Sequence, residues 1–311
     1  MNHVLYTTLA TLCLAAATFA QSTAAVSAGT VSFVDFENRT PGVYGNAEAK
    51  EDFKRNDYDK SWWYALDKNN GENSKIVYDG EQHGNVLQLK YPKGCVGPND
   101  NDTPACAGQI IQPLVKVADT MWSAYDIFFE DGFEFNLGGK LPGLCGGKCY
   151  TGNAMPQTGD GWSARIMWRK GGNAVQLIYF MGQASEYGDK NGRVQAWLDG
   201  ELALDIDTLR LRDYDTVHVD KFYLSTFHGG SSAEWAPTHD CFIRFDNFAV
   251  STDSIAVTAN APDTSSTDRI WTPRQNRAGS APTEMTPTKA YRINGSRVGE
   301  KKANYEVKVG R

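Results

Sequence analysis

The chain has 311 residues and a mass of 34.3 kDa, which is enough for one large domain or two small ones. Hydrophobic residues make up 41% of it and aromatic residues 12%, which excludes wholesale disorder, while 30 glycines and a charged fraction of 22% favour strands and turns over coiled coils or helical solenoids. The net charge of −6 argues against a nucleic-acid partner.

Residues 1–20 are predicted to be a signal peptide. The apolar run from Val4 to Ala20 is too short for a stable membrane span and ends in Thr18-Phe19-Ala20, a small-x-small pattern that signal peptidase accepts. An N-terminal anchor or a buried helix is the alternative, since no Lys or Arg precedes the run. We therefore expect a secreted, extracellular protein without a membrane partner.

Residues 21–251 are predicted to form one all-β domain, a jelly-roll β-sandwich with a concave substrate cleft. Short helices could occupy the stretches 45–70 and 205–214. Alternating, β-branched and aromatic runs separated by Gly, Asn and Asp predict strands at Val31–Phe36, Lys75–Tyr78, Val86–Tyr91, Gln109–Leu114, Trp122–Phe129, Phe133–Leu137, Trp162–Arg169, Val175–Met181, Val194–Leu198, Val217–Phe227 and Phe242–Val250.

The cysteines that follow the signal segment predict two local disulfides. Cys95 pairs with Cys106 and Cys145 with Cys149, which leaves Cys241 unpaired in a strand. No clustered histidine accompanies the C-x₃-C spacing, so a zinc site is disfavoured, and no motif requires a metal or a cofactor.

Three segments between residues 137 and 181 carry candidate chemistry. Glycines surround Lys140 in LGGKLPGLCGGKC, which predicts a constrained loop that holds a functional lysine; a solvated surface lysine is the alternative. In the strand at 162–169, Ser163, Arg165 and Arg169 share one face, where arginines suit carboxylate recognition, unless the face is merely solvated.

The third segment, Val175–Met181, follows the hairpin signal Lys170-Gly-Gly-Asn173. A three-residue loop closed by residues 170 and 174 places Tyr179 opposite Arg165, whereas a two-residue Gly-Gly loop places Ile178 there and turns Tyr179 to the other face. The functional interpretation predicts the three-residue loop. We expect Arg169, Gln176 and His228 to bind substrate, His228 from a position beside a glycine pair at the edge of a cleft.

Other charged groups carry no predicted chemistry. Glu130, Asp131 and Glu134 lie in a turn and are predicted to be solvated, and His83, His218 and His239 show no metal-ligand spacing.

Residues 252–311 differ in amino-acid composition from the predicted domain at 21–251. A flexible Ser/Thr/Pro-rich linker is expected from about Thr252 to Thr288. The remainder is either a basic hairpin around Asn294-Gly295 or a disordered tail. The segment contains 10 Lys/Arg against 6 Asp/Glu, so it carries +4 on a body of −10.

A lysine, an arginine, a tyrosine and a serine without paired acids fit β-elimination on a uronic-acid polymer. The reaction removes the C5 proton, which needs a cation on the carboxylate, a base, and an acid for the leaving oxygen. Arg165 suits the first role, Lys140 or Tyr179 the second and Tyr179 the third. Glycosidase and serine-hydrolase signatures (E-x-D-x-x-E and G-x-S-x-G) do not occur.

The ordered set GGKLPGL, GWSARIMWR, a tyrosine-bearing strand, FHGGSxxxWAP and FDNF, within about residues 75–251, resembles polysaccharide lyase family 14. The resemblance implies a β-jelly roll that cleaves alginate or glucuronate polymers. It matches Lys140 to the family's essential lysine, Ser163 and Arg165 to its strand pair, and Tyr179 to the second of two tyrosines, the first of which is replaced by Leu177.

These features predict a monomeric lyase that acts on an acidic polysaccharide, either alginate or glucuronan. A related glucuronan lyase family of the same architecture keeps both substrates open. The alternative from another functional class is a non-catalytic carbohydrate-binding protein built on the same fold.

Overall fold

The structure is a computed structural model that describes residues 28–53, 63–81, 83–98, 104–152, 154, 156, 158–180, 189–198, 201–230, 232–255, 291–292 and 303–310. The predicted signal peptide and most of the predicted linker lie outside the described residues. Within the described ranges, no helix combines the length and the apolar character needed to cross a bilayer.

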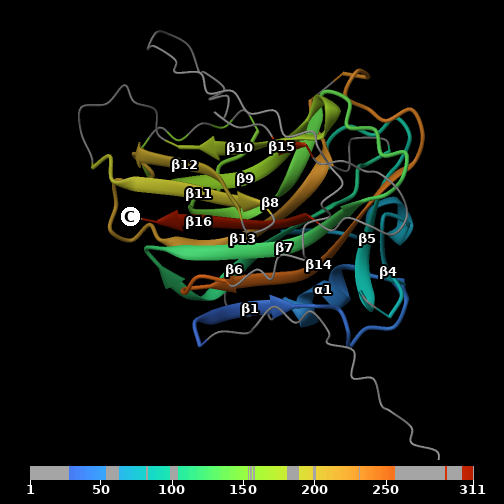
Figure 1. Ribbon diagram of the computed structural model, residues 1–311, viewed down its shortest axis with the longest axis horizontal. Helices are drawn as coiled ribbons and strands as arrows, with labels where there is room; N and C mark the ends of the chain where they lie inside the picture. Colours follow the sequence, from blue (N-terminus) through green and yellow to red (C-terminus); the bar gives the residue numbers. More distant parts are fainter. Residues whose placement is uncertain are drawn as a thin grey trace, which may run out of the picture.

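Strands dominate the described residues and form two antiparallel sheets (Figure 1). The larger sheet has nine strands in the order β12 (Glu201–Leu209), β11 (Gly192–Leu198), β16 (Ala303–Gly310), β7 (Met121–Phe129), β14 (Cys241–Ser251), β5 (Asn85–Tyr91), β4 (Ser74–Tyr78) and β2 (Gly42–Val43), with β1 (Thr30–Val34) pairing beside β14. The smaller sheet has seven strands in the order β15 (Tyr291–Arg292), β10 (Asn173–Tyr179), β9 (Gly161–Arg169), β8 (Gly138–Gly147), β13 (Val219–His228), β6 (Gly108–Ala118) and β3 (Trp63–Ala65). One short helix, α1 (Asn46–Asp52), lies within the first stretch expected to hold helices.

The core lies between the two sheets. Alternate residues of each strand point inward, so that Leu87 and Ile127 of the larger sheet join Leu144, Ile166 and Leu224 of the smaller sheet in one buried cluster. This arrangement confirms the predicted all-β sandwich.

The glycine-rich segment around Lys140 differs from its prediction as a loop, since it is strand β8 at the centre of the smaller sheet. The predicted strand Phe133–Leu137 is wrong, because these residues form the turn that leads into β8. A helix at 205–214 is also wrong, because Glu201–Leu209 is strand β12.

For the C-terminal remainder the sequence leaves a hairpin around Asn294-Gly295 and a disordered tail open, and Asn294 and Gly295 themselves lie outside the described residues. β15 pairs with β10 of the smaller sheet, whereas β16 lies between β7 and β11 of the larger one (Figure 1). The two segments that flank Asn294-Gly295 therefore belong to different sheets instead of pairing with each other.

Candidate active site

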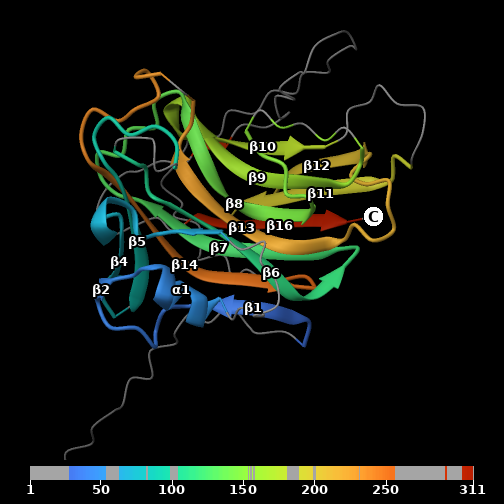
Figure 2. The same ribbon diagram turned by 180° about the vertical axis from the view of Figure 1, so that it is seen from behind.

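The site is built on the face of the smaller sheet that points away from the core, at β8, β9, β10 and β13 (Figure 2). β9 alternates as predicted: Trp162, Ala164, Ile166 and Trp168 belong to the core cluster, so Ser163, Arg165, Met167 and Arg169 share the other face. We call this second face the arginine face.

The register between β9 and β10 differs from both predicted alternatives. The strands close at Arg169 and Asn173 around the three residues Lys170–Gly172, so that Leu177 lies opposite Arg165 and Tyr179 opposite Ser163. Gly171 and Gly172 both take positive φ in this turn, which closes the hairpin one residue earlier on each strand than predicted. Tyr179 thus lies opposite a residue two positions away from the one predicted. Because side chains alternate between the two faces of a strand, a shift by two residues keeps Tyr179 on the arginine face.

Arg165 is a buried cation at the centre of this face, with an exposed fraction of 0%. Its Nη1 donates to Ser225 Oγ at 3.1 Å, and its Nη2 donates to Thr151 Oγ1 at 2.9 Å. Its guanidinium carbon lies 4.6 Å from the ring centre of Tyr223 and 5.9 Å from that of Tyr179. No carboxylate among the described residues forms an ion pair with it, and desolvation lowers the pKa of the guanidinium.

A hydrogen-bonded set from β13 and β6 supports Arg165. Tyr223 Oη and Ser225 Oγ both donate to Gln109 Oε1, at 3.1 and 3.3 Å. Sequence reasoning missed Gln109, Tyr223, Ser225 and Thr151. Gln109, Tyr223 and Ser225 lie more than 50 positions from residue 165 in the chain, and the pairing of β6 with β13, β13 with β8 and β8 with β9 brings them near Arg165.

Lys140 lies on the arginine face of β8, where it pairs with Met167 of β9 and Phe227 of β13. Its Nζ is 3.1 Å from Met167 Sδ, and its side chain is half-buried. The register of β8 against β9 shifts between Lys140 and Gly143, which indicates a bulge just after the lysine. The structure therefore brings Lys140, Arg165 and Tyr179 onto one face, as the sequence predicts.

The loop after β8 covers part of the arginine face. The Cys145–Cys149 disulfide is present as predicted, as is Cys95–Cys106, and Cys241 is free and buried. Tyr150 and Thr151 directly follow Cys149, so the Cys145–Cys149 disulfide holds the loop where Thr151 contacts Arg165.

Ser163 and Gln176 take positions other than those expected of groups that contact a substrate. Ser163 is buried, and its Oγ donates to the backbone carbonyl of Tyr150 at 2.6 Å, so that it anchors the covering loop. Gln176 lies opposite Ile166, on the face of the sheet opposite to Arg165, and its Nε2 donates to the backbone carbonyl of Arg165 at 2.9 Å.

His228 does not line a cleft. Its ring is fully buried, stacked on Phe133 at 5.6 Å and edge-on to Tyr91 and Trp168. Desolvation lowers the pKa of this histidine to about 4. Arg169, by contrast, stays half-buried on the arginine face at the end of β9.

The family comparison covers the segments that build this site. The model of the family described as polysaccharide lyase 14 matches residues 79–187 and 181–248, more than half of the chain. The chain belongs to polysaccharide lyase family 14. This family 14 protein is a polysaccharide lyase. Of the two functions predicted from the sequence, the enzyme is therefore favoured over the non-catalytic carbohydrate-binding protein.

Solved structures share the fold of this lyase at low sequence identity. The alginate lyase Aly36B is 20% identical with a TM-score of 0.57, over 73% of this chain and 98% of that one. A variant of Aly36B with a lysine and a methionine replaced by alanine, in complex with alginate trisaccharide, is 18% identical with a TM-score of 0.58, over 73% and 99%. A marine family 14 alginate lyase from Aplysia kurodai is 19% identical with a TM-score of 0.56, over 72% and 99%. No curated protein sequence matches the chain.

Proposed function

We propose that this family 14 lyase is secreted and cleaves a polyuronate, alginate or glucuronan, by β-elimination at the arginine face. The observation that carries the proposal is Arg165, a fully buried guanidinium with no ion-paired carboxylate among the described residues. A buried cation of this kind favours an anion nearby, because charge interactions are strong where water is excluded.

The reaction assigns each group a role. A base takes the C5 proton, the electron pair forms the C4–C5 double bond, the C4–O bond breaks, and the leaving oxygen receives a proton. Lys140 or Tyr179 is the base, and Tyr179 is the acid. Arg165 is held by Ser225 and Thr151 beneath the tyrosine rings, so it stabilises the carboxylate and its enolate-like transition state through its charge from within the sheet.

The neighbouring structures support the substrate class. Alginate trisaccharide is bound by an Aly36B variant that lacks a lysine and a methionine, and in this chain Lys140 contacts Met167 on the arginine face. The half-buried Tyr179 and Arg169 lie on the same face, where an acidic chain would meet a phenol and a second guanidinium.

The test follows the ultraviolet absorbance of the unsaturated uronate. The full-length chain is incubated with alginate, polymannuronate, polyguluronate and glucuronan, and we expect absorbance to rise with at least one polymer. Lys140→Ala abolishes the rise, whereas Lys148→Ala, which changes an exposed lysine of the covering loop, keeps it. No rise with any polymer contradicts β-elimination of polyuronates, and a wild-type rate in Lys140→Ala overturns the role of that lysine.

A further inference from the structure

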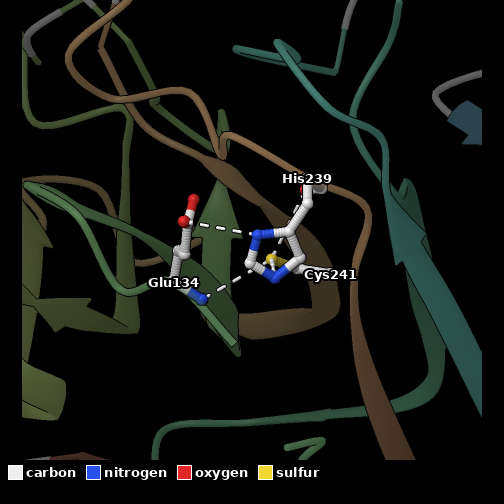
Figure 3. A group of neighbouring side chains, drawn as sticks. All are labelled: Glu134, His239 and Cys241. Atoms are coloured by element: carbon white, nitrogen blue, oxygen red, sulfur yellow. Dashed lines mark hydrogen bonds and ion pairs between the residues drawn. The ribbon is translucent and has the colours of Figure 1, made fainter. Parts of the chain in front are cut away.

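A second cluster of reactive side chains lies outside the arginine face (Figure 3). Glu134 comes from the turn between β7 and β8, His239 from the loop between β13 and β14, and Cys241 is the first residue of β14. We call these three residues the loop triad. The sequence predicts no site here, because the three residues show no ligand spacing along the chain.

The donor atoms of the triad lie close together around the imidazole of His239, with one neighbour at each ring nitrogen. Glu134 Oε1 lies 3.3 Å from His239 Nδ1, and Cys241 Sγ lies 3.8 Å from His239 Nε2. One ligand atom from each residue lies within 4.8 Å of the others. Ligands of a tetrahedral zinc ion at about 2.0–2.3 Å from the metal stand roughly 3.3–3.6 Å apart, so the separations within the triad must shorten by at most about 1.5 Å to complete a shell of three.

The mobility needed for this step is available at the histidine. Its side chain is 52% exposed, so water can replace the contacts of its ring with Glu134 and the Gly132 carbonyl when the ring turns to direct one nitrogen to the metal. The other two ligands are held in place: the amide and hydroxyl of Thr238 both donate to the Glu134 carboxylate, and the amide of Glu134 donates to Cys241 Sγ at 3.5 Å.

We propose that Glu134, His239 and Cys241 bind a thiophilic divalent ion of the zinc class. A thiolate, an imidazole and a carboxylate form a ligand set that suits zinc, whereas calcium and magnesium prefer shells of oxygen. The carbonyl oxygen of Gly132, 3.0 Å from His239 Nε2, or a water molecule completes the coordination.

The place of the triad indicates a structural role. The ion ties the turn that leads into β8 to the loop that leads into β14, and Lys140 lies six positions after Glu134 along the chain. The order Cys–His–Glu also resembles that of a nucleophilic triad. Cys241, however, is only 2% exposed, which leaves a substrate no approach to its sulfur, so metal binding is the use that the burial favours.

Cobalt is the probe for this site, because a thiolate bound to Co²⁺ gives a charge-transfer band in the near ultraviolet. The purified full-length chain is treated with a chelator and titrated with CoCl₂, and we expect the band to saturate at one equivalent and to disappear on addition of ZnCl₂. Cys241→Ser loses the band. His239→Ala and Glu134→Gln weaken Co²⁺ binding at least tenfold, whereas His218→Ala, a change in a histidine paired with Asp119, leaves it unchanged.

A second measurement guards against a Cys241→Ser variant that does not fold. In the wild-type chain, Zn²⁺ raises Tm, and His239→Ala removes this effect. Absence of the cobalt band in the wild type overturns the proposal, as does a band of equal strength in His239→Ala. An equal rise of Tm with Zn²⁺ in the wild type and in His239→Ala also overturns it.

Discussion

Burial of the charged Arg165 guanidinium is unfavourable for folding, and the proposed role of this residue in catalysis explains why it is buried. Desolvation lowers the pKa of its guanidinium, which means that the charged form is disfavoured in the folded state. Arg165→Met removes this unpaired charge, so we expect no loss of Tm, while turnover falls by a factor on the order of 100 or more because the transition-state charge loses its cation. Both quantities are measured on the same preparation, by ultraviolet assay and thermal unfolding.

Arg244 is the matched control for this substitution. It is ion-paired with Asp79 and Glu130, at 2.5 and 2.8 Å, on the larger sheet. Arg244→Met therefore lowers Tm and leaves turnover near the wild-type rate. Full turnover in Arg165→Met, or a loss of stability larger than that of Arg244→Met, contradicts the assignment of Arg165 as a functional cation.

His228 makes the stability of the fold sensitive to acid. Its pKa is lowered to about 4, chiefly by desolvation, which outweighs the opposite influence of Glu134. The neutral ring is favoured in the folded state, so its contribution is fully present above the unfolded pKa of about 6.5 and is lost as the pH falls towards 4. The difference corresponds to about 3 kcal/mol of unfolding free energy.

The variant His228→Phe keeps an aromatic ring among Tyr91, Phe133 and Trp168 but does not titrate. We expect urea unfolding between pH 7 and pH 4 to show a smaller loss of stability in this variant than in the wild type. Parallel pH profiles for the two proteins mean that His228 is not held neutral by the core.

At the scale of elements, β8 shows why a glycine-rich segment forms a central strand. A Cβ at Gly139 would lie 2.0 Å from the Trp168 ring, and one at Gly146 would lie 2.6 Å from Trp162 Nε1 and 2.1 Å from the carbonyl oxygen of His218. The glycines thus make room for tryptophans of the neighbouring strand β9. Their composition alone resembles a loop, which is the reason that the sequence prediction failed here.

Gly139→Ala therefore forces a methyl group into the Trp168 ring beside Lys140. We expect a loss on the order of 2 kcal/mol in stability and a lower turnover, because β8 must shift. Gly229→Ala is the control, since the nearest atom to its added Cβ, on the Trp235 ring, lies at 3.3 Å. Thermal unfolding of the two variants tests this expectation. Equal Tm values would show that β8 has room for a Cβ at residue 139.

How well each feature of the site is predicted depends on whether a local pattern in the sequence determines it. The alternation of residues 162–169 is local, so both faces of β9 are predicted correctly. The hairpin register depends on two glycines with positive φ, which composition does not specify. The supporting residues Gln109 and Ser225 are brought to Arg165 only by the order of β9, β8, β13 and β6, which no local pattern encodes.

At the scale of the whole molecule, charge does not attract the proposed substrate. The chain carries −6, so an acidic polymer must be bound by local cations at the arginine face. At physiological salt the Debye length is about 8 Å, so distant acidic residues are largely screened while contacts with Lys140 and Arg169 are retained. Recognition in this lyase is therefore expected to depend on the face and not on the net charge.

The C-terminal strand joins the last part of the chain to the domain. β16 fills the position between β7 and β11, where Val307 pairs with Ser123 on one side and Ala196 on the other. Val307→Pro removes a backbone N–H from the middle of this ladder, so we expect a loss on the order of 2 kcal/mol, or about 5 °C in Tm. Val307→Thr keeps the N–H and the β-branched shape and is the matched control. Calorimetry of the full-length chain compares the two, and a Val307→Pro variant that unfolds at the wild-type temperature would show that the larger sheet is stable without β16 and that the tail is an appendage.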